Sequence, residues 1–305
     1  MPESLLATFQ SSPALTIGTA LLVGLLVGSF LNVVILRLPR MMDREWVGQA
    51  AEILREKLPA GSARTAFDAL TAPVRDAAAR RYDLAVPRSA CPHCGHAITA
   101  LENVPIASWL WLRGRCSACR APISARYPLV EAATGVLCAA AAWKYGATFA
   151  TLAAVTLTCF LIALAMIDLD TQLLPDDMTV PLLWIGLLVN LFGIFSPLAD
   201  AVIGAIAGYL ALWSVYWLFR LATGKEGMGH GDFKLLAALG AWFGWASLPA
   251  IVLLSSAVGA AVGLAMIAGG RLKREVPIPF GPYLAGAGLL ALYLREPIDA
   301  WLGLR

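Results

Sequence analysis

Long runs of mainly apolar residues recur through most of this chain, and they restrict its fold more than any other feature. A helix needs about 20 such residues to cross the hydrocarbon core of a membrane. The 305 residues are 59% hydrophobic and 14% charged, whereas soluble globular proteins are usually about 45–50% apolar and about 25% charged. The sequence therefore predicts an all-α polytopic membrane protein.

Eight of these runs are expected to be transmembrane helices. They cover residues 14–36, 129–145, 149–167, 179–196, 199–219, 233–247, 249–270 and 280–295. The polar region between the first and second runs predicts an amphipathic helix from Trp46 to Leu58 and a second helical stretch at about 63–82. The expected domains are a first transmembrane helix at 1–36, a domain outside the membrane at 37–128, and a seven-helix membrane domain at 129–305.

Lysine and arginine residues are distributed unevenly between the two ends of these helices. The region 37–128 contains fourteen of the 23, and the connections at 220–234 and 271–274 contain six more. Because cytoplasmic loops are enriched in Lys and Arg, both termini are expected on the opposite side of the membrane. The basic residues follow the first apolar run, which favours a retained anchor over a cleaved signal peptide.

Two acidic motifs lie at the predicted cytoplasmic ends of helices. Asp168 opens the stretch 168–177, and Asp232 closes the glycine-rich stretch Gly227-Met228-Gly229-His230-Gly231-Asp232. Glycines at these positions are expected to leave room for the backbone of a substrate. Two aspartates that are held close together cannot both ionise easily, so one keeps a proton. Such a pair can act as acid and base on one water, which predicts an enzyme that cuts peptide bonds at the membrane surface.

Other interpretations of these carboxylates remain open on the residues alone. Asp170, Asp176 and Asp177 can simply mark the membrane interface, and Asp176 is also suited to the first turn of the next helix. A carboxylate-dependent ion or proton-coupled transporter would use the same residues. Nucleotide binding is excluded, because Asp232 stands where G-x-G-x-x-G requires its third glycine and no βαβ unit surrounds it.

Four of the six cysteines form two Cys-x-x-Cys pairs. Cys91 and Cys94 are followed, after 21 intervening residues, by Cys116 and Cys119. This spacing is typical of a tetrahedral zinc site, and four thiolates would make the site structural. The two remaining cysteines, at 138 and 159, fall inside apolar runs and are expected to be core residues.

Taken together, these motifs resemble the type IV prepilin peptidase family. The resemblance includes Gly28-Ser29-Phe30-Leu31-Asn32-Val33-Val34 with Arg37-Leu38-Pro39, the cysteine region with Ile123 to Pro128 and Glu131, and the stretches around Asp168 and Asp232. The Gly-x-Gly-Asp pattern at 229–232 is also shared with preflagellin peptidases and presenilin-like proteases. The motifs follow the family's order through nearly the whole chain, apart from the insert at about 41–86.

The resemblance implies a bifunctional enzyme of the bacterial inner membrane, in which the charge distribution places both termini in the periplasm. It implies that Asp168 and Asp232 cleave the leader peptide of prepilins and pseudopilins at the cytoplasmic face. It also implies that the four cysteines bind zinc and that the new N-terminus is methylated with S-adenosylmethionine. Candidates for binding this methyl donor are Gly114 and Glu131. The expected partners are these substrates and the lipid bilayer, with no nucleic acid.

Overall fold

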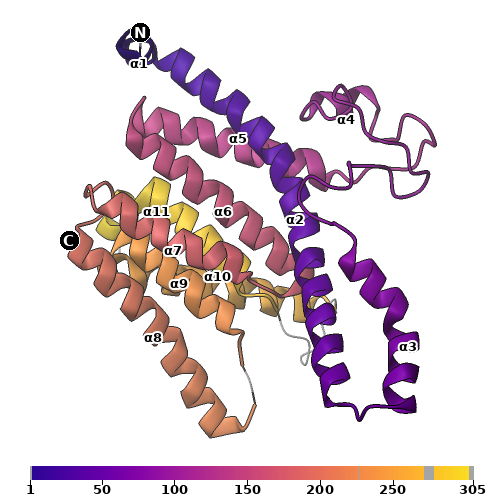
Figure 1. Cartoon of the computed structure of the whole chain (residues 1–305). Coiled ribbons are helices and arrows are strands. Elements are labelled where there is room, and N and C mark those ends of the chain that lie inside the picture. Colours follow the sequence, from indigo (N-terminus) through magenta and orange to yellow (C-terminus); the bar gives the residue numbers. More distant parts are fainter. Residues whose placement is uncertain (1, 226, 271–277, 302–305) are drawn as a thin grey trace. The chain divides into compact units, whose positions relative to one another are not determined.

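The computed structural model describes residues 2–225, 227–270 and 278–301, and it is helical throughout these ranges apart from turns and loops. Its elements, labelled in Figure 1, are α1 (Pro2–Ser11), α2 (Pro13–Lys57), α3 (Ser62–Ala79), α4 (Ala107–Trp111), α5 (Arg126–Tyr145), α6 (Phe149–Thr171), α7 (Asp176–Asn190), α8 (Leu198–Thr223), α9 (His230–Phe243), the 3₁₀ turn η1 (Trp245–Ser247), α10 (Leu248–Ala268) and α11 (Gly281–Trp301). Two isolated β-bridges, Ala90–Ala97 and Arg115–Pro122, are the only extended pairings among the described residues. The all-helical prediction is confirmed.

Four helices in the described ranges are long and apolar enough to cross a membrane. They are α2, α6, α8 and the segment Trp245–Ala268, which consists of η1 and α10. The apolar segment Gly281–Leu294 of α11 is shorter. Helices α7 and α9 have 15 and 14 residues, fewer than the roughly 20 that a simple crossing requires. The protein therefore has the apolar helices of a membrane protein.

Helix α2 is longer than the sequence predicts, because it continues without a break through Pro39. A proline inside a helix removes one backbone hydrogen bond and usually kinks or ends the helix. Here Ile35, Arg37 and Leu38 are buried around the proline, so packing beside it favours continuation. The apolar run at 14–36 and the predicted amphipathic helix at 46–58 are thus parts of one helix.

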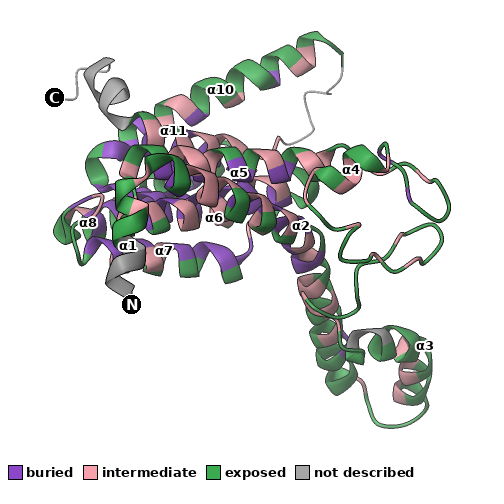
Figure 2. Ribbon diagram, turned by 90° about the horizontal axis from the view of Figure 1, so that it is seen from above, coloured by how far each residue is buried: buried purple, intermediate pink, exposed green. Residues whose placement is uncertain are grey.

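The chain divides into two compact units, one of residues 1–28 and 129–305 and the other of residues 29–128. In the first unit, α9 is the most buried helix and packs against α7, α8 and α11. Most residues of α9 are buried, whereas Figure 2 shows that much of α10 is exposed. Trp242 on α9 is fully buried, and its Nε1 donates to the Leu182 carbonyl at 2.9 Å.

Small residues allow α8 and α9 to approach each other closely. A Cβ added at Gly240 would collide with the backbone carbonyl group of Gly204, and one added at Gly208 would lie 2.6 Å from the Leu236 carbonyl oxygen. Such glycine contacts are typical of helix packing in membranes, where the backbones can touch. These contacts fix α9, and therefore its first turn, against α8.

In the second unit, α3 runs back beside the later part of α2 (Figures 1 and 2). The Arg55 Nε lies 2.8 Å from Asp68 Oδ1, and Arg75 reaches the same oxygen at 3.0 Å. The sequence prediction of a helical stretch at about 63–82 agrees with α3, which ends three residues earlier at Ala79.

Candidate active site and metal centre

Asp168 lies in the last turn of α6, where the helix ends in a left-handed residue. Gln172 has φ +55°, and its N–H donates to the Asp168 carbonyl at 2.9 Å. The Asp168 side chain is only 5% exposed, and its Oδ2 accepts the Gly281 N–H at 2.9 Å. A backbone donor from the start of α11 therefore fixes the carboxylate that ends α6.

Asp232 lies in the first turn of α9, and Gly229 is the N-cap residue of this helix. Asp232 is 7% exposed. The first turn of a helix carries partial positive charge, which favours a carboxylate there. The neighbouring His230 ring lies 5.1 Å from the Tyr216 ring and 5.3 Å from the Phe233 ring, so aromatic contacts hold this turn to α8.

The carboxylates of Asp168 and Asp232 are close enough for their charges to repel each other. Helix α11 contacts both α6 and α9 and so connects the elements that hold the two aspartates. Asp168 and Asp232, with 63 residues of sequence between them, lie in the same compact unit. A buried pair of this kind can share a proton, so that one carboxylate accepts a proton while the other donates one.

The glycines around the aspartates serve more than one purpose. A Cβ at Gly231 would lie 2.7 Å from Leu174 Cβ, and one at Gly227 would lie 2.8 Å from the Phe219 ring. These two glycines therefore allow close packing within the protein. Only Gly229 has no atom within 4 Å of such a Cβ, so open space lies beside this glycine of the motif alone.

The other acidic residues of the first motif differ in their surroundings. Asp176 is exposed and forms an ion pair with Lys234 Nζ, at 2.6 Å and 2.7 Å from its two oxygens. Asp170 and Asp177 are exposed as well. Asp168 is therefore the buried carboxylate of its motif.

Gly281 is the residue of this site that the sequence does not reveal. A Cβ there would lie 2.6 Å from Asp168 Oδ2 and 3.1 Å from Leu174 Cδ2, so the position accepts only glycine without rearrangement. The one available signal is the sequence Phe280-Gly281-Pro282 at the start of the last apolar run. It indicates a helix start but not a contact with a residue 113 positions earlier.

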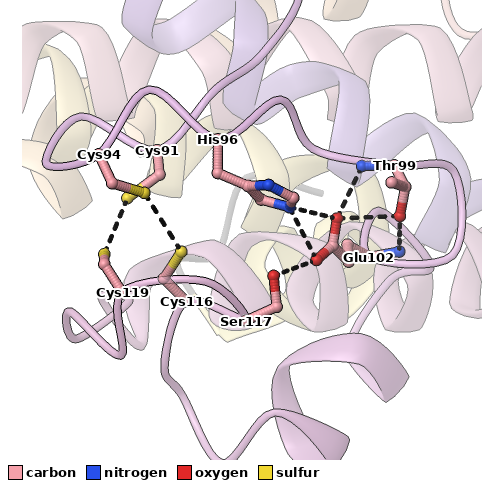
Figure 3. Close-up of polar contacts among 8 residues, drawn as sticks. All are labelled: Cys91, Cys94, His96, Thr99, Glu102, Cys116, Ser117 and Cys119. Atoms are coloured by element: carbon pink, nitrogen blue, oxygen red, sulfur yellow. Dashed lines mark hydrogen bonds and ion pairs between the residues drawn. The ribbon is translucent and has the colours of Figure 1, made fainter.

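The four cysteines predicted to bind metal come together in the second unit (Figure 3). All four sulfur atoms lie within 4.8 Å of one another, with Cys91 and Cys119 at 3.7 Å and Cys94 and Cys116 at 4.0 Å. A tetrahedral zinc ion with Zn–S bonds of about 2.3 Å separates its sulfur ligands by about 3.8 Å. The cluster therefore fits a metal site with four cysteine ligands.

Backbone N–H groups stabilise thiolates at the start of each pair. The N–H groups of His93 and Cys94 lower the pKa of Cys91 to about 7, and those of Cys119 and Ala118 lower the pKa of Cys116. The His96 N–H also lowers the pKa of Cys94. The thiols of Cys119, Cys91 and Cys116, together with burial, outweigh this effect and raise the Cys94 pKa to about 12. A bound cation favours the thiolate form of all four.

A single carboxylate connects the two cysteine pairs. Glu102 accepts hydrogen bonds from the Thr99 N–H at 2.8 Å and the Thr99 hydroxyl at 2.9 Å, and from the Ser117 hydroxyl (Figure 3). His96 Nε2 lies 3.2 Å from both of its oxygens. These donors, Ser117 first, lower the pKa of Glu102 to about 2. Since His96 follows the first pair and Ser117 lies within the second, Glu102 holds the two pairs together.

The two candidate residues for a methyl donor lie in different settings. Gly114 has φ +66°, and its N–H donates to the Trp109 carbonyl at 2.8 Å. A Cβ there would meet the Trp109 ring at 3.0 Å, so the turn itself requires glycine. Glu131 is a buried carboxylate, 8% exposed, in the first part of α5.

Comparison with known proteins agrees with this architecture. The model of the bacterial peptidase A24 N-terminal domain matches residues 22–145, and that of the type IV leader peptidase family matches residues 155–264. No solved structure matches the chain. The proteins named prepilin leader peptidase/N-methyltransferase from Stutzerimonas stutzeri, Aeromonas hydrophila and Pseudomonas aeruginosa are 55%, 54% and 51% identical to it.

These matches extend over nearly the full length of both partners. They cover 95%, 97% and 96% of this chain and 94%, 97% and 96% of the three relatives, respectively. The two family models also lie in the order that the motifs predict, with the cysteine region in the first and both aspartates in the second. Nothing in the comparisons supports the transporter alternative. The chain belongs to the type IV leader peptidase family.

Proposed function

We propose that this protein cleaves the leader peptide of type IV prepilins and of type II secretion pseudopilins, and that it methylates the N-terminus exposed by the cut. The observation that supports the peptidase role is the buried pair Asp168 and Asp232, with the Gly281 N–H bound to one of its oxygens. The relatives named above have both activities in their names.

In the proposed reaction the two aspartates act on one water. The ionised carboxylate takes a proton from the water as its oxygen attacks the scissile carbonyl carbon. The protonated carboxyl donates a hydrogen bond to the carbonyl oxygen, and the carboxyl that took the water proton passes it to the departing amine. The Gly281 N–H holds Asp168 in position through this exchange, and the open space beside Gly229 is available to the substrate backbone.

The second activity requires S-adenosylmethionine, which supplies an electrophilic methyl group when bound. Glu131 and Gly114 are our candidate residues for binding it. A buried carboxylate such as Glu131 suits the positive sulfonium of the donor. Binding of labelled donor to the purified protein and to Glu131→Gln tests this role, and equal binding by the two proteins contradicts it.

We further propose that eight helices cross the inner membrane, with both termini in the periplasm and the aspartates at the cytoplasmic face. The excess of Lys and Arg in 37–128 supports this orientation. In this arrangement residues 37–128 form a cytoplasmic domain between the first and second spans, and residues 129–305 form the peptidase domain. The domain's four cysteines, Cys91, Cys94, Cys116 and Cys119, bind one structural zinc ion, which their sulfur spacing supports.

Mass spectrometry of a co-expressed prepilin tests both activities at once. Asp168→Asn and Asp232→Asn should each lower leader cleavage by a factor of about 10²–10⁴ or more, because each removes one proton-transfer group. Asp177→Asn is the matched control, since Asp177 is an exposed carboxylate of the same acidic stretch. Normal cleavage by either dyad variant disproves the mechanism, and a cleaved but unmethylated pilin from the wild type disproves the second activity.

A further inference from the structure

A basic groove in the second unit has no part in the chemistry described so far. It lies between α2 and the end of α3 and has a volume of about 460 Å³. Three arginines, Arg44, Arg80 and Arg81, line it together with Tyr82, and Glu45 is its one carboxylate. None of its lining residues belongs to the aspartate pair or to the cysteine cluster.

The wall of the groove is fixed by a buried arginine. Arg37 is 7% exposed and donates to the carbonyls of Asp83 at 2.9 Å and Pro87 at 2.6 Å. These bonds hold the segment after α3 against α2. In the same segment, the Tyr82 ring lies 3.9 Å beneath the Arg44 guanidinium carbon. The relative positions of the groove's cations are therefore set by the packing of the protein.

The acidic groups nearby leave the groove with an excess of positive charge. The Asp83 carboxylate accepts Arg81 Nε and the N–H groups of Ala85 and Val86, each at 2.7 Å. The Arg81 hydrogen bond and these two N–H groups lower the Asp83 pKa to about 2. Glu45 accepts a hydrogen bond from Gln49 at 3.1 Å. Arg44 contacts an aromatic ring, and Arg80 is exposed.

The groove also lies close to the end of an apolar run. That run ends at Leu36, and Arg44 is eight residues further along the same continuous helix, a distance of roughly 12 Å at the rise of an α-helix. The polar headgroup layer of a bilayer is about 5–8 Å thick on each side. Because arginine side chains can reach several ångströms back toward the interface, the guanidinium groups can meet the headgroup phosphates.

We infer that this groove binds the phosphate headgroup of an anionic phospholipid. Guanidinium groups bind phosphate oxygens with charge-assisted, often bidentate hydrogen bonds. Basic pockets beside a membrane-spanning helix recognise anionic headgroups in this way. A bound lipid would join α2 and the end of α3 at the membrane surface.

The test uses the full-length protein in nanodiscs of phosphatidylcholine containing increasing fractions of phosphatidylglycerol, with bound lipid counted by native mass spectrometry. Arg44→Gln and Arg80→Gln should each weaken retention of phosphatidylglycerol about fivefold. Arg75→Gln is the matched control, because it removes one positive charge from α3 at a residue that pairs with Asp68 outside the groove. It should retain phosphatidylglycerol like the wild type.

Three results would overturn the inference. Equal weakening by Arg75→Gln would mean that the attraction is spread over the whole basic surface. Displacement of the lipid by millimolar inorganic phosphate would mean a site for small free anions. Unchanged retention in Arg80→Gln would mean that the groove does not hold the headgroup. Arg44→Lys keeps the positive charge. It should retain more lipid than Arg44→Gln, and an equal zinc content in the two variants would show that both are folded.

Discussion

At the scale of single residues, the site depends on contacts that distinguish one aspartate from its neighbours. From the sequence alone, Asp170 and Asp176 compete with Asp168 as the partner of Asp232. Burial separates Asp168 from the others. The ion pair of Asp176 with Lys234 also gives Asp176 a separate role, since it connects the start of α7 to α9.

Asp176→Asn tests this distinction. Because the Asp176 side chain is 62% exposed, the pair resembles surface ion pairs that contribute about 0.2–1 kcal/mol. Initial rates of leader cleavage should therefore fall by no more than about fivefold, which is the rate equivalent of 1 kcal/mol. A loss as large as that of Asp232→Asn would instead place Asp176 in the catalytic pair.

Gly281→Ala tests the support of Asp168. The new Cβ would lie 2.6 Å from Asp168 Oδ2 and must displace it. A displacement of about 1 Å at a reacting group can cost about 100-fold in rate, and we expect a loss of that size in the turnover of a prepilin peptide. Gly286→Ala on the same helix is the control, since nothing lies within 4 Å of its Cβ. Equal activity of the two variants would contradict the support role.

At the scale of elements, the apolar runs predict the helices well because their pattern is local. Helix α2 is longer than the two separate helices that the sequence predicts, because packing around Pro39 outweighs the usual tendency of a proline to end a helix. The approach of α11 to α6 is also hidden from the sequence, since it joins residues 113 positions apart. The cysteine cluster is predictable from its spacing, whereas the role of Glu102 depends on how two loops fold together.

The packing of α8 against α9 leads to a prediction about stability. Gly240→Ala places a methyl group against the Gly204 backbone, which cannot move as a flexible side chain can. Overpacking of this kind costs about 1–3 kcal/mol, so the midpoint of thermal unfolding in detergent should fall by several degrees. Gly18→Ala, where the added Cβ has open space, should leave the midpoint unchanged or raise it slightly. Similar midpoints for both variants would mean that this contact adjusts without cost.

At the scale of the whole molecule, the division into two units separates the aspartates from the cysteines. In the unit of residues 29–128, the two Cys-x-x-Cys pairs lie in loops, with little helix around them. Its stability should therefore depend on the metal, because four cysteines from two distant loops need a common ligand to stay together. The unit with the aspartates has its own buried core around α9. Loss of metal is thus expected to affect the two units unequally.

Hydrogen exchange of the full-length protein can measure this difference. In Cys91→Ser/Cys119→Ser, amides of residues 88–125 should exchange at least ~10³-fold faster, since a structural zinc ion contributes on the order of 10 kcal/mol. Amides of α6 and α9 should keep their protection, because these helices pack within the other unit. Cys159→Ala is the control, as this cysteine lies on α6 outside the cluster, and it should retain one zinc per chain. Equal loss of protection in both units would mean that they do not fold independently.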